Sequence, residues 1–449
     1  MNSQFHSTEV AGLFAPAQQL AYMLEFEGAL AKVQGDLGLI PAAASRAIVA
    51  ACSDRKLIAR IDLSPAALAG NAAIPFVQQL TALIASVDTH AAAWVHHGST
   101  SQDVIDTAIT LAMRDTLSRI SPDLRQLRET VAALALAHAR TPMIARTLLQ
   151  QATPTTFGYK LAASLAGLDQ LATRLAQISR SGLFLQLGGP VGTLATAGAL
   201  APELVAGVAV RLGLRAAPIC WHTNRVSIVE CGSALAALTG QLAKIARDVI
   251  LGMQTEVGEL AESAAPGKGG STAMPHKHNP VDAVVAAAAA TVTPQLAAAL
   301  LASMVQEHER AAGAWHAEWV VLPQLCSLTH GALLAVTNTF RGLRIDTERM
   351  QANLTCALRT ACATALAETL GPTVGRDVAH DLVHSWSQTA LNGNRTLREV
   401  AVQELATANV NLGREQLDEV FSIDRDIAAA EARTLDYLTQ RKEGASFDG

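Results

Sequence analysis

Residues 266–280 combine side chains that could perform acid–base chemistry beside a carboxylate. The segment holds three glycines ahead of Ser271, and it ends with Lys277, Asn279 and Pro280. Glycines at this density predict an irregular, mobile loop. Asn279 and Pro280 predict a helix start, because Asn caps free N–H groups and Pro fits the first helical position. A lysine beside the positive end of a helix favours a carboxylate or phosphate ligand.

A second polar segment, residues 96–103, reads His-His-Gly-Ser-Thr-Ser-Gln-Asp. One glycine and three hydroxyl side chains predict a turn, and Asp103 falls where the first turn of the next helix would begin. The free N–H groups of such a turn suit an anion. The alternative interpretation is a capping turn with a structural histidine, since Ser and Thr caps are common.

The third polar segment, residues 306–319, holds six ionisable side chains and two tryptophans. Arg310 is the best candidate in it for a bidentate grip on a carboxylate. The alternative is a solvated ion-pair surface. The histidine pairs 276 with 278 and 308 with 316 lack a third ligand at a motif spacing, so we expect no metal. No phosphate-loop or dinucleotide fingerprint accompanies the glycines, so we expect no cofactor.

Residues 270–280 read Gly-Ser-Thr-Ala-Met-Pro-His-Lys-His-Asn-Pro and resemble the signature of the fumarase/aspartase superfamily, Gly-Ser-Ser-x-Met-Pro-x-Lys-x-Asn-Pro. In that superfamily the first serine takes a proton from the carbon next to a carboxylate, and the lysine and asparagine bind that carboxylate. The resemblance implies that Ser271 is the catalytic residue and that Lys277 and Asn279 bind substrate. The residues expected to support the loop or an oxyanion are Lys268, Gly270 and Thr272.

Three more segments resemble the same superfamily. Residues 96–103 are similar to its His-x-Gly-x-Thr-Ser-x-Asp region, and residues 145–154 to its Arg-Thr-His-x-Gln-x-Ala-x-Pro segment. Residues 306–319 resemble a stretch typical of bacterial 3-carboxy-cis,cis-muconate cycloisomerases. The side chains that these resemblances place at the substrate are those of His96, Thr100, Ser101, Gln102, Gln150 and Arg310.

The chain departs from the superfamily at a reactive position. Leu148 stands where many relatives carry a histidine that acts as general acid, and Val284 stands where they carry the glutamate that orients it. A departing amine or hydroxide needs a proton, whereas a carboxylate, with an ordinary pKa of about 4, leaves as a stable anion. The double loss indicates the cycloisomerase branch, in which the group added or expelled is a carboxylate of the substrate itself.

The resemblance thus implies an intramolecular lyase that interconverts 3-carboxy-cis,cis-muconate and 4-carboxymuconolactone in protocatechuate (β-ketoadipate) catabolism, through an enediolate. The partner implied is a small-molecule tricarboxylate. An intermolecular lyase, such as adenylosuccinate or argininosuccinate lyase, stays an alternative. A non-catalytic structural relative is the other.

Composition indicates packed helices to position these segments. The 449 residues are 50% hydrophobic but only 4% aromatic, which favours helix over sheet. Residues 225–263 predict one long amphipathic helix, with an apolar heptad stripe that should be core. Residues 111–139 predict a helix pair broken near Pro122, and five helices are expected in the last domain: 348–358, 365–370, 376–391, 397–406 and 414–420.

The superfamily resemblance implies an all-α fold of three helical domains, with a central bundle of long helices. The expected domains are residues 1–106, 107–344 and 345–449. In that superfamily the bundle is built from four subunits and each active site takes its motif regions from three chains. A homotetramer with shared active sites is therefore expected.

Charge and cysteine content restrict partners and compartment. The formal net charge of −5 argues against nucleic acid or an anionic membrane as partner. Residues 284–302 carry no charge but are rich in alanine, so we expect a tightly packed buried helix and not a membrane span. No secretory signal is expected at the N-terminus. The six cysteines lack Cys-x-x-Cys spacing, which favours reduced thiols in the cytoplasm.

Overall fold

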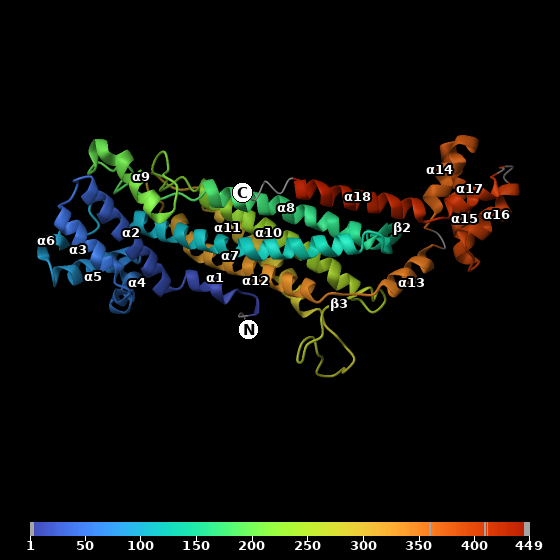
Figure 1. Cartoon of the computed structure of the whole chain (residues 1–449), viewed down its shortest axis with the longest axis horizontal. Coiled ribbons are helices and arrows are strands. Elements are labelled where there is room, and N and C mark those ends of the chain that lie inside the picture. The colour runs from blue at the N-terminus through green and yellow to red at the C-terminus, as the bar shows by residue number, and fades with distance from the viewer. Residues whose placement is uncertain (1–3, 359–360, 408–409, 411, 444–449) are drawn as a thin grey trace. The chain divides into compact units, whose positions relative to one another are not determined.

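Helices form nearly all of the regular structure in the computed structural model, which describes residues 4–358, 361–407, 410 and 412–443 (Figure 1). This architecture confirms the all-α prediction. The first helices are α1 (Thr8–Leu13), α2 (Pro16–Asp36), α3 (Ala42–Ser53), η2 (Arg55–Arg60), α4 (Ala66–Ala69), α5 (Ala73–Ala85), α6 (Thr89–Ala92), α7 (Ser101–Ala137), α8 (Phe157–Ser181), η3 (Gly198–Leu200) and α9 (Ala201–Leu212).

The remaining helices are α10 (Val226–Gly252), α11 (Val281–Ala302), α12 (Ala314–Arg341), α13 (Thr347–Ala357), α14 (Ala363–Val374), α15 (Arg376–Asn392), α16 (Leu397–Thr407), α17 (Arg414–Val420) and α18 (Asp424–Glu443). Four short strands pair in two antiparallel ladders: β1 (Pro142–Thr147) with β2 (Gln150–Thr156), and β3 (Leu260–Ala261) with β4 (Arg344–Ile345).

Contacts within the chain divide it into two compact units, each made of three segments. Unit 1 comprises Met1–Arg125, Gln170–Ala246 and Ala283–Thr337, and unit 2 comprises Gln126–Asp169, Arg247–Asp282 and Asn338–Gly449. In unit 1, α2 packs against α3 and α9. The division into three domains at residues 106 and 344 stays a prediction.

The apolar stripe predicted for residues 225–263 is real and buried. Its members Ile228, Cys231, Leu235, Leu238, Leu242, Ile245 and Val249 are at most 2% exposed. Thr239 of α10 donates a hydrogen bond to Thr329 of α12 at 2.9 Å, so α10 packs within its own chain. The predicted length was wrong, because α10 ends at Gly252. The chain folds back there, and a Cβ on Gly252 would lie 2.7 Å from Leu260 Cδ1.

Two further helices differ from expectation. Residues 111–139 were expected to break near Pro122, but α7 runs unbroken through it. Buried Ile120 and Leu124 flank the proline, so packing on both sides outweighs the hydrogen bond that Pro removes. Helix α11 forms, but the prediction that it is buried was wrong for a single chain, where Val284 and Val292 are exposed.

The helices α10, α11 and α12 are long and apolar enough to cross a membrane, by length and composition only.

The C-terminal segment of unit 2 contains the five predicted helices and one that was missed. Helices α14, α15, α16 and α17 enclose a core around Leu366, Trp386 and Leu405. Helix α18 was not predicted, because its exposed face is rich in charge and its buried stripe is thin. It packs against β2, whereas α13 packs against β1.

Candidate active site

The loop that carries Ser271 is closed at its base within unit 2 (Figure 1). Gly269 O accepts the Asn279 N–H at 2.9 Å. A Cβ on Gly269 would lie 2.8 Å from Asn279 O, so glycine is required for this approach. Ser271 Oγ accepts backbone N–H groups from Met274 at 3.1 Å and Ala273 at 3.4 Å. Two such donors stabilise negative charge on this oxygen.

The capping role predicted for Asn279 was wrong. Its Nδ2 donates to Gly269 O at 3.2 Å and Gly270 O at 3.4 Å, so the side chain closes the loop instead. Helix α11 begins at Val281, and Glu262 Oε2 accepts the N–H of Asp282 in its first turn at 3.2 Å. The expected helix start is therefore present, but a glutamate from before the loop caps it.

The two lysines of the loop differ in their surroundings. Lys268 Nζ lies 2.6 Å from Asp282 and 3.4 Å from Glu262. Burial lowers the pKa of Lys268, but these two carboxylates outweigh burial and raise it. Lys277 is exposed, and within the described ranges no ion pair involves its ammonium group. Thr272 is exposed as well.

Gln150 lies at the tip of the β1–β2 hairpin. Thr147 pairs with Gln150, so Leu148 and Leu149 form a two-residue turn. Both leucines have left-handed backbones, with φ of 50° and 65°, and are 97% and 73% exposed. The stem is fixed in unit 2, where Arg146 binds Glu259 through two hydrogen bonds of 2.7 and 3.0 Å.

In unit 1 the predicted site residue His96 is paired with a buried carboxylate. Its Nδ1 lies 2.5 Å from Glu27 Oε1, and Glu27 is 1% exposed. Burial lowers the pKa of His96, but the charge and hydrogen bond of Glu27 outweigh it, so the pKa is raised. His96 therefore has a protonated form stabilised beside Thr100 and Ser101, which follow the Gly98 turn.

Asp103 joins three parts of unit 1 at the start of α7. Its carboxylate accepts the N–H groups of Thr100 at 3.1 Å, Gly188 at 3.0 Å and Gly189 at 2.9 Å. The Nε2 of His222 lies 2.8 Å from Asp103 Oδ1. Burial lowers the pKa of His222, but the bond to Asp103 outweighs it and raises the pKa to about 9.

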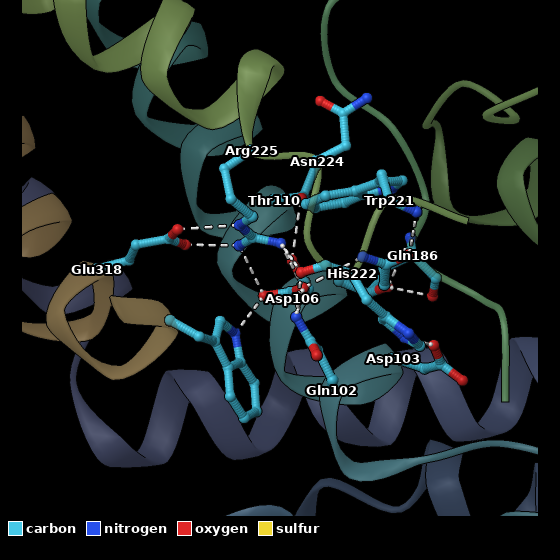
Figure 2. Close-up of polar contacts among 12 residues, drawn as sticks. Gln102, Asp103, Asp106, Thr110, Gln186, Trp221, His222, Asn224, Arg225 and Glu318 are labelled. Carbon is cyan, nitrogen blue, oxygen red and sulfur yellow. Dashed lines mark hydrogen bonds and ion pairs between the residues drawn. The ribbon is translucent and has the colours of Figure 1, made fainter. Parts of the chain in front are cut away.

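A buried ion triad lies one turn further along α7 (Figure 2). Arg225 donates two hydrogen bonds to Asp106, of 2.8 and 3.0 Å, and two to Glu318, of 2.9 and 2.5 Å. All three side chains are fully buried. Trp315 Nε1 also donates to Asp106, at 2.8 Å. Burial raises the pKa of Glu318, and Arg225 opposes that rise.

Arg310 is exposed, but hydrogen bonds to residues of the 96–103 segment and to Pro190 hold its guanidinium group. Its Nε donates to Gln102 Oε1 at 3.1 Å, and its Nη2 donates to Thr100 Oγ1 at 3.2 Å and Pro190 O at 3.1 Å. No hydrogen bond or ion pair among the described residues involves Nη1. The two N–H groups of Nη1 can therefore receive a carboxylate, whereas the bidentate grip expected from the sequence would need Nη2 or Nε, which are already engaged.

The predicted site residues fall into two groups. Unit 1 brings together His96, Thr100, Ser101, Gln102 and Arg310, whereas unit 2 holds Lys268, Gly270, Ser271, Thr272, Lys277, Asn279 and Gln150. Polar contacts within one unit hold His96, Thr100, Gln102 and Arg310 in unit 1, and Lys268, Ser271 and Asn279 in unit 2. Roles for these residues in catalysis or binding stay proposals.

Sequence reasoning missed several residues that order the site. Glu27, Asp106 and Gln186 sit in ordinary helical or loop sequence, and no spacing marks them. Arg225 and Glu318 were within segments singled out, yet their pairing across 93 residues is invisible in one sequence. In the described part of the chain, no group of three or more His, Cys, Asp or Glu could hold a metal ion.

Comparisons with known proteins place the chain in a family. A profile of a family described as lyase matches residues 7–293. The 3-carboxy-cis,cis-muconate cycloisomerase of Bradyrhizobium diazoefficiens is 48% identical over 335 residues, covering 75% of this chain and 74% of that protein. Its counterpart from Pseudomonas aeruginosa is 44% identical over 354 residues, covering 79% and 77%.

Solved structures extend the similarity to the fold. The crystal structure of 3-carboxy-cis,cis-muconate lactonizing enzyme from Pseudomonas putida matches with a TM-score of 0.89 and 39% identity, over 100% of this chain and 99% of that one. The chain belongs to the lyase family of the fumarase/aspartase superfamily, which the signature at residues 270–280 predicted.

Proposed function

We propose that this protein is a 3-carboxy-cis,cis-muconate cycloisomerase. The observation that carries the proposal is its identity of 44–48% to two cycloisomerases over three quarters of the chain. Leu148 supports it, because the position that carries a general acid in many superfamily members is an apolar side chain on an exposed turn. A carboxylate that departs as an anion needs no acid there.

In the lactonising direction, an oxygen of one substrate carboxylate forms a bond to a carbon of the conjugated diene. The electron pair of the attacked double bond moves towards a second carboxylate and forms an enediolate. Lys277 and Arg310 supply the positive charge that stabilises it. The adjacent carbon then takes a proton from Ser271 Oγ. In reverse, Ser271 removes that proton and the ring oxygen departs as a carboxylate.

Ser271 can serve in both directions only if its alkoxide is stabilised, because an ordinary hydroxyl is a weak acid. The N–H groups of Ala273 and Met274 point at its Oγ. Lys268 is already paired with Asp282 and Glu262. We therefore assign stabilisation of the Ser271 alkoxide to Lys277, and we assign to Lys268 the role of holding the base of the loop.

We also propose a cytoplasmic homotetramer in which the two groups of site residues meet between copies. Exposed apolar side chains on α11, among them Val284, Val292 and Leu301, support association, because a helix with such a face needs a partner in water. Six free cysteines support a reducing compartment.

Turnover with three substrates tests the function. Purified protein should remove the diene absorbance of 3-carboxy-cis,cis-muconate and release no fumarate from adenylosuccinate or argininosuccinate. Ser271→Ala should lower kcat by about 10²–10⁴-fold, the usual contribution of acid–base catalysis. His276→Ala is the matched control at an exposed position of the same loop, and we expect kcat within about tenfold of wild type. Fumarate release would establish an intermolecular lyase, and no turnover of any substrate would favour a structural relative.

A further inference from the structure

The side chain of Gln102 is fully buried and all of its polar atoms are engaged. Its Nε2 donates to Asp106 Oδ2 at 3.1 Å and to His222 O at 2.8 Å, and its Oε1 accepts from Arg310 Nε at 3.1 Å. The two acceptors beside Nε2 fix the amide orientation, because an inverted amide would face them with its oxygen. Gln102 thus presents an acceptor to Arg310, and both of its N–H groups are engaged, so none is left to donate to a substrate carboxylate.

Asp106, which accepts a hydrogen bond from Gln102 Nε2, is held on several sides. Asp106 accepts from Arg225, Trp315, Gln102 and Gln186, so its carboxylate has little freedom to turn. Figure 2 shows Gln102 directed at Asp106, with the Arg225 guanidinium between Asp106 and Glu318. The Arg225 guanidinium also lies over the Trp221 ring, 4.8 Å from its centroid. Buried networks that are fully satisfied hold one geometry.

We infer that Gln102 is a positioning residue, which transmits the fixed geometry of the Arg225–Asp106–Glu318 triad to the exposed Arg310 guanidinium. This role replaces direct substrate contact by Gln102. The inference rests on the proposed function in one respect only, namely that Arg310 binds a substrate carboxylate. Arg310 would otherwise lose rotamer freedom on binding, and three hydrogen bonds have removed that freedom beforehand.

The triad also sets the local charge. With both carboxylates ionised, Arg225, Asp106 and Glu318 carry one net negative charge in a site sealed from water. The Arg310 guanidinium, connected through a neutral amide, lies at the exposed end of this chain of bonds. A neutral linker suits this place, because a carboxylate there would neutralise Arg310 and weaken its hold on an anion.

A double-mutant cycle tests the coupling. Gln102→Met keeps the side-chain volume and removes the bond to Arg310, so it should weaken binding of propane-1,2,3-tricarboxylate about tenfold by calorimetry. In an Arg310→Ala background the same change should have almost no effect, because the residue it acts through is gone. Kinetically, KM for the substrate should rise more than kcat falls.

Gln186→Met is the matched control. Gln186 is equally buried and donates to the same oxygen, Asp106 Oδ2, at 3.2 Å, but no hydrogen bond joins it to Arg310. Its effect on binding should be the same with and without Arg310, whereas melting temperatures report the structural loss in both variants. If Gln102→Met does not fold, Gln102→Ala enters the same cycle, and its loss of binding should likewise disappear in the Arg310→Ala background.

Two outcomes separate this inference from the proposed function. A loss of binding that is undiminished in the Arg310→Ala background would overturn the positioning role and return Gln102 to direct contact. Coupled binding in a protein that fails to turn over 3-carboxy-cis,cis-muconate would keep the positioning role and overturn the cycloisomerase assignment.

Discussion

Single buried charges order the part of the site in unit 1. Glu27, Asp103 and Asp106 are almost fully buried, and each has a cationic or ring partner. Removing one partner of such a pair leaves an uncompensated charge, which destabilises a fold by about 3–5 kcal/mol. Positions like these tolerate substitution poorly even when they never meet a ligand.

The His222–Asp103 pair predicts a loss of stability in alkaline solution. The pKa of His222 is raised to about 9 in the folded chain, above the value of about 6.5 for an unfolded chain. The protonated ring therefore stabilises the fold fully below pH of about 6.5, and this contribution is lost as pH rises through about 9. The loss is of the order of 3 kcal/mol.

Urea unfolding of wild type and His222→Gln, from pH 6 to 10, measures this contribution as a difference. The wild type should lose its advantage over the variant between pH of about 6.5 and 9. A difference that stays constant over that range would show that His222 does not change protonation on unfolding.

At the scale of elements, the β1–β2 hairpin has an unusual turn. Two-residue hairpin turns with left-handed residues favour Asn-Gly, because side chains collide with the backbone in that region. Here both positions are leucine, with φ of 50° and 65°. Their exposure also leaves apolar surface in water.

Comparing glycine with alanine at Leu149 isolates this strain. Both substitutions remove the exposed side chain, but only glycine relaxes at a φ of 65°. We expect Leu149→Gly to be more stable than Leu149→Ala by about 1 kcal/mol. In helices and strands glycine is usually less stabilising than alanine, so the expected order at Leu149 is the reverse. Thermal melting of both variants measures it, and a more stable alanine variant would contradict strain at the turn.

The sequence predicted most elements from local patterns. The stripe of α10 and the helices α13 to α17 follow from apolar periodicity, which reports burial directly. The break expected near Pro122 and the continuation of α10 beyond Gly252 were wrong, and α18 was missed. Tertiary packing, which local patterns do not report, decides where a helix forms and ends. In the site, Ser271 and Lys277 stand in a recognisable motif, but the partners of Asp106 come from segments far apart in the chain. Such long-range pairing leaves no trace in one sequence.

For the whole molecule, the expected residues divide between unit 1 and unit 2. If the site forms between copies, a defect in one unit should be complemented by a copy that is defective only in the other. Ser271→Ala and Arg310→Ala affect different units. The first should lower turnover and the second should weaken substrate binding, so each alone should have little activity at substrate concentrations near the wild-type KM. After subunit exchange in a tetramer, roughly a quarter of the sites would carry both intact side chains.

Activity should therefore return on mixing the two variants, to roughly a quarter of the wild-type value. The control is each variant taken through the exchange procedure alone. Native mass spectrometry of differently tagged subunits verifies that mixed assemblies have formed. Mixed assemblies without recovered activity would contradict a site shared between copies.

The closed base of the Ser271 loop has a consequence for how this segment moves. Gly269 and Asn279 join its ends, and Lys268 clamps the flanking carboxylates of Glu262 and Asp282. Because the ends of the loop are tied together, we expect it to close over a ligand as one unit, with conformational entropy lost mainly by residues 271–278. We therefore expect a protease to cleave first within residues 271–278 and to leave the base of the loop, at Gly269 and Asn279, intact.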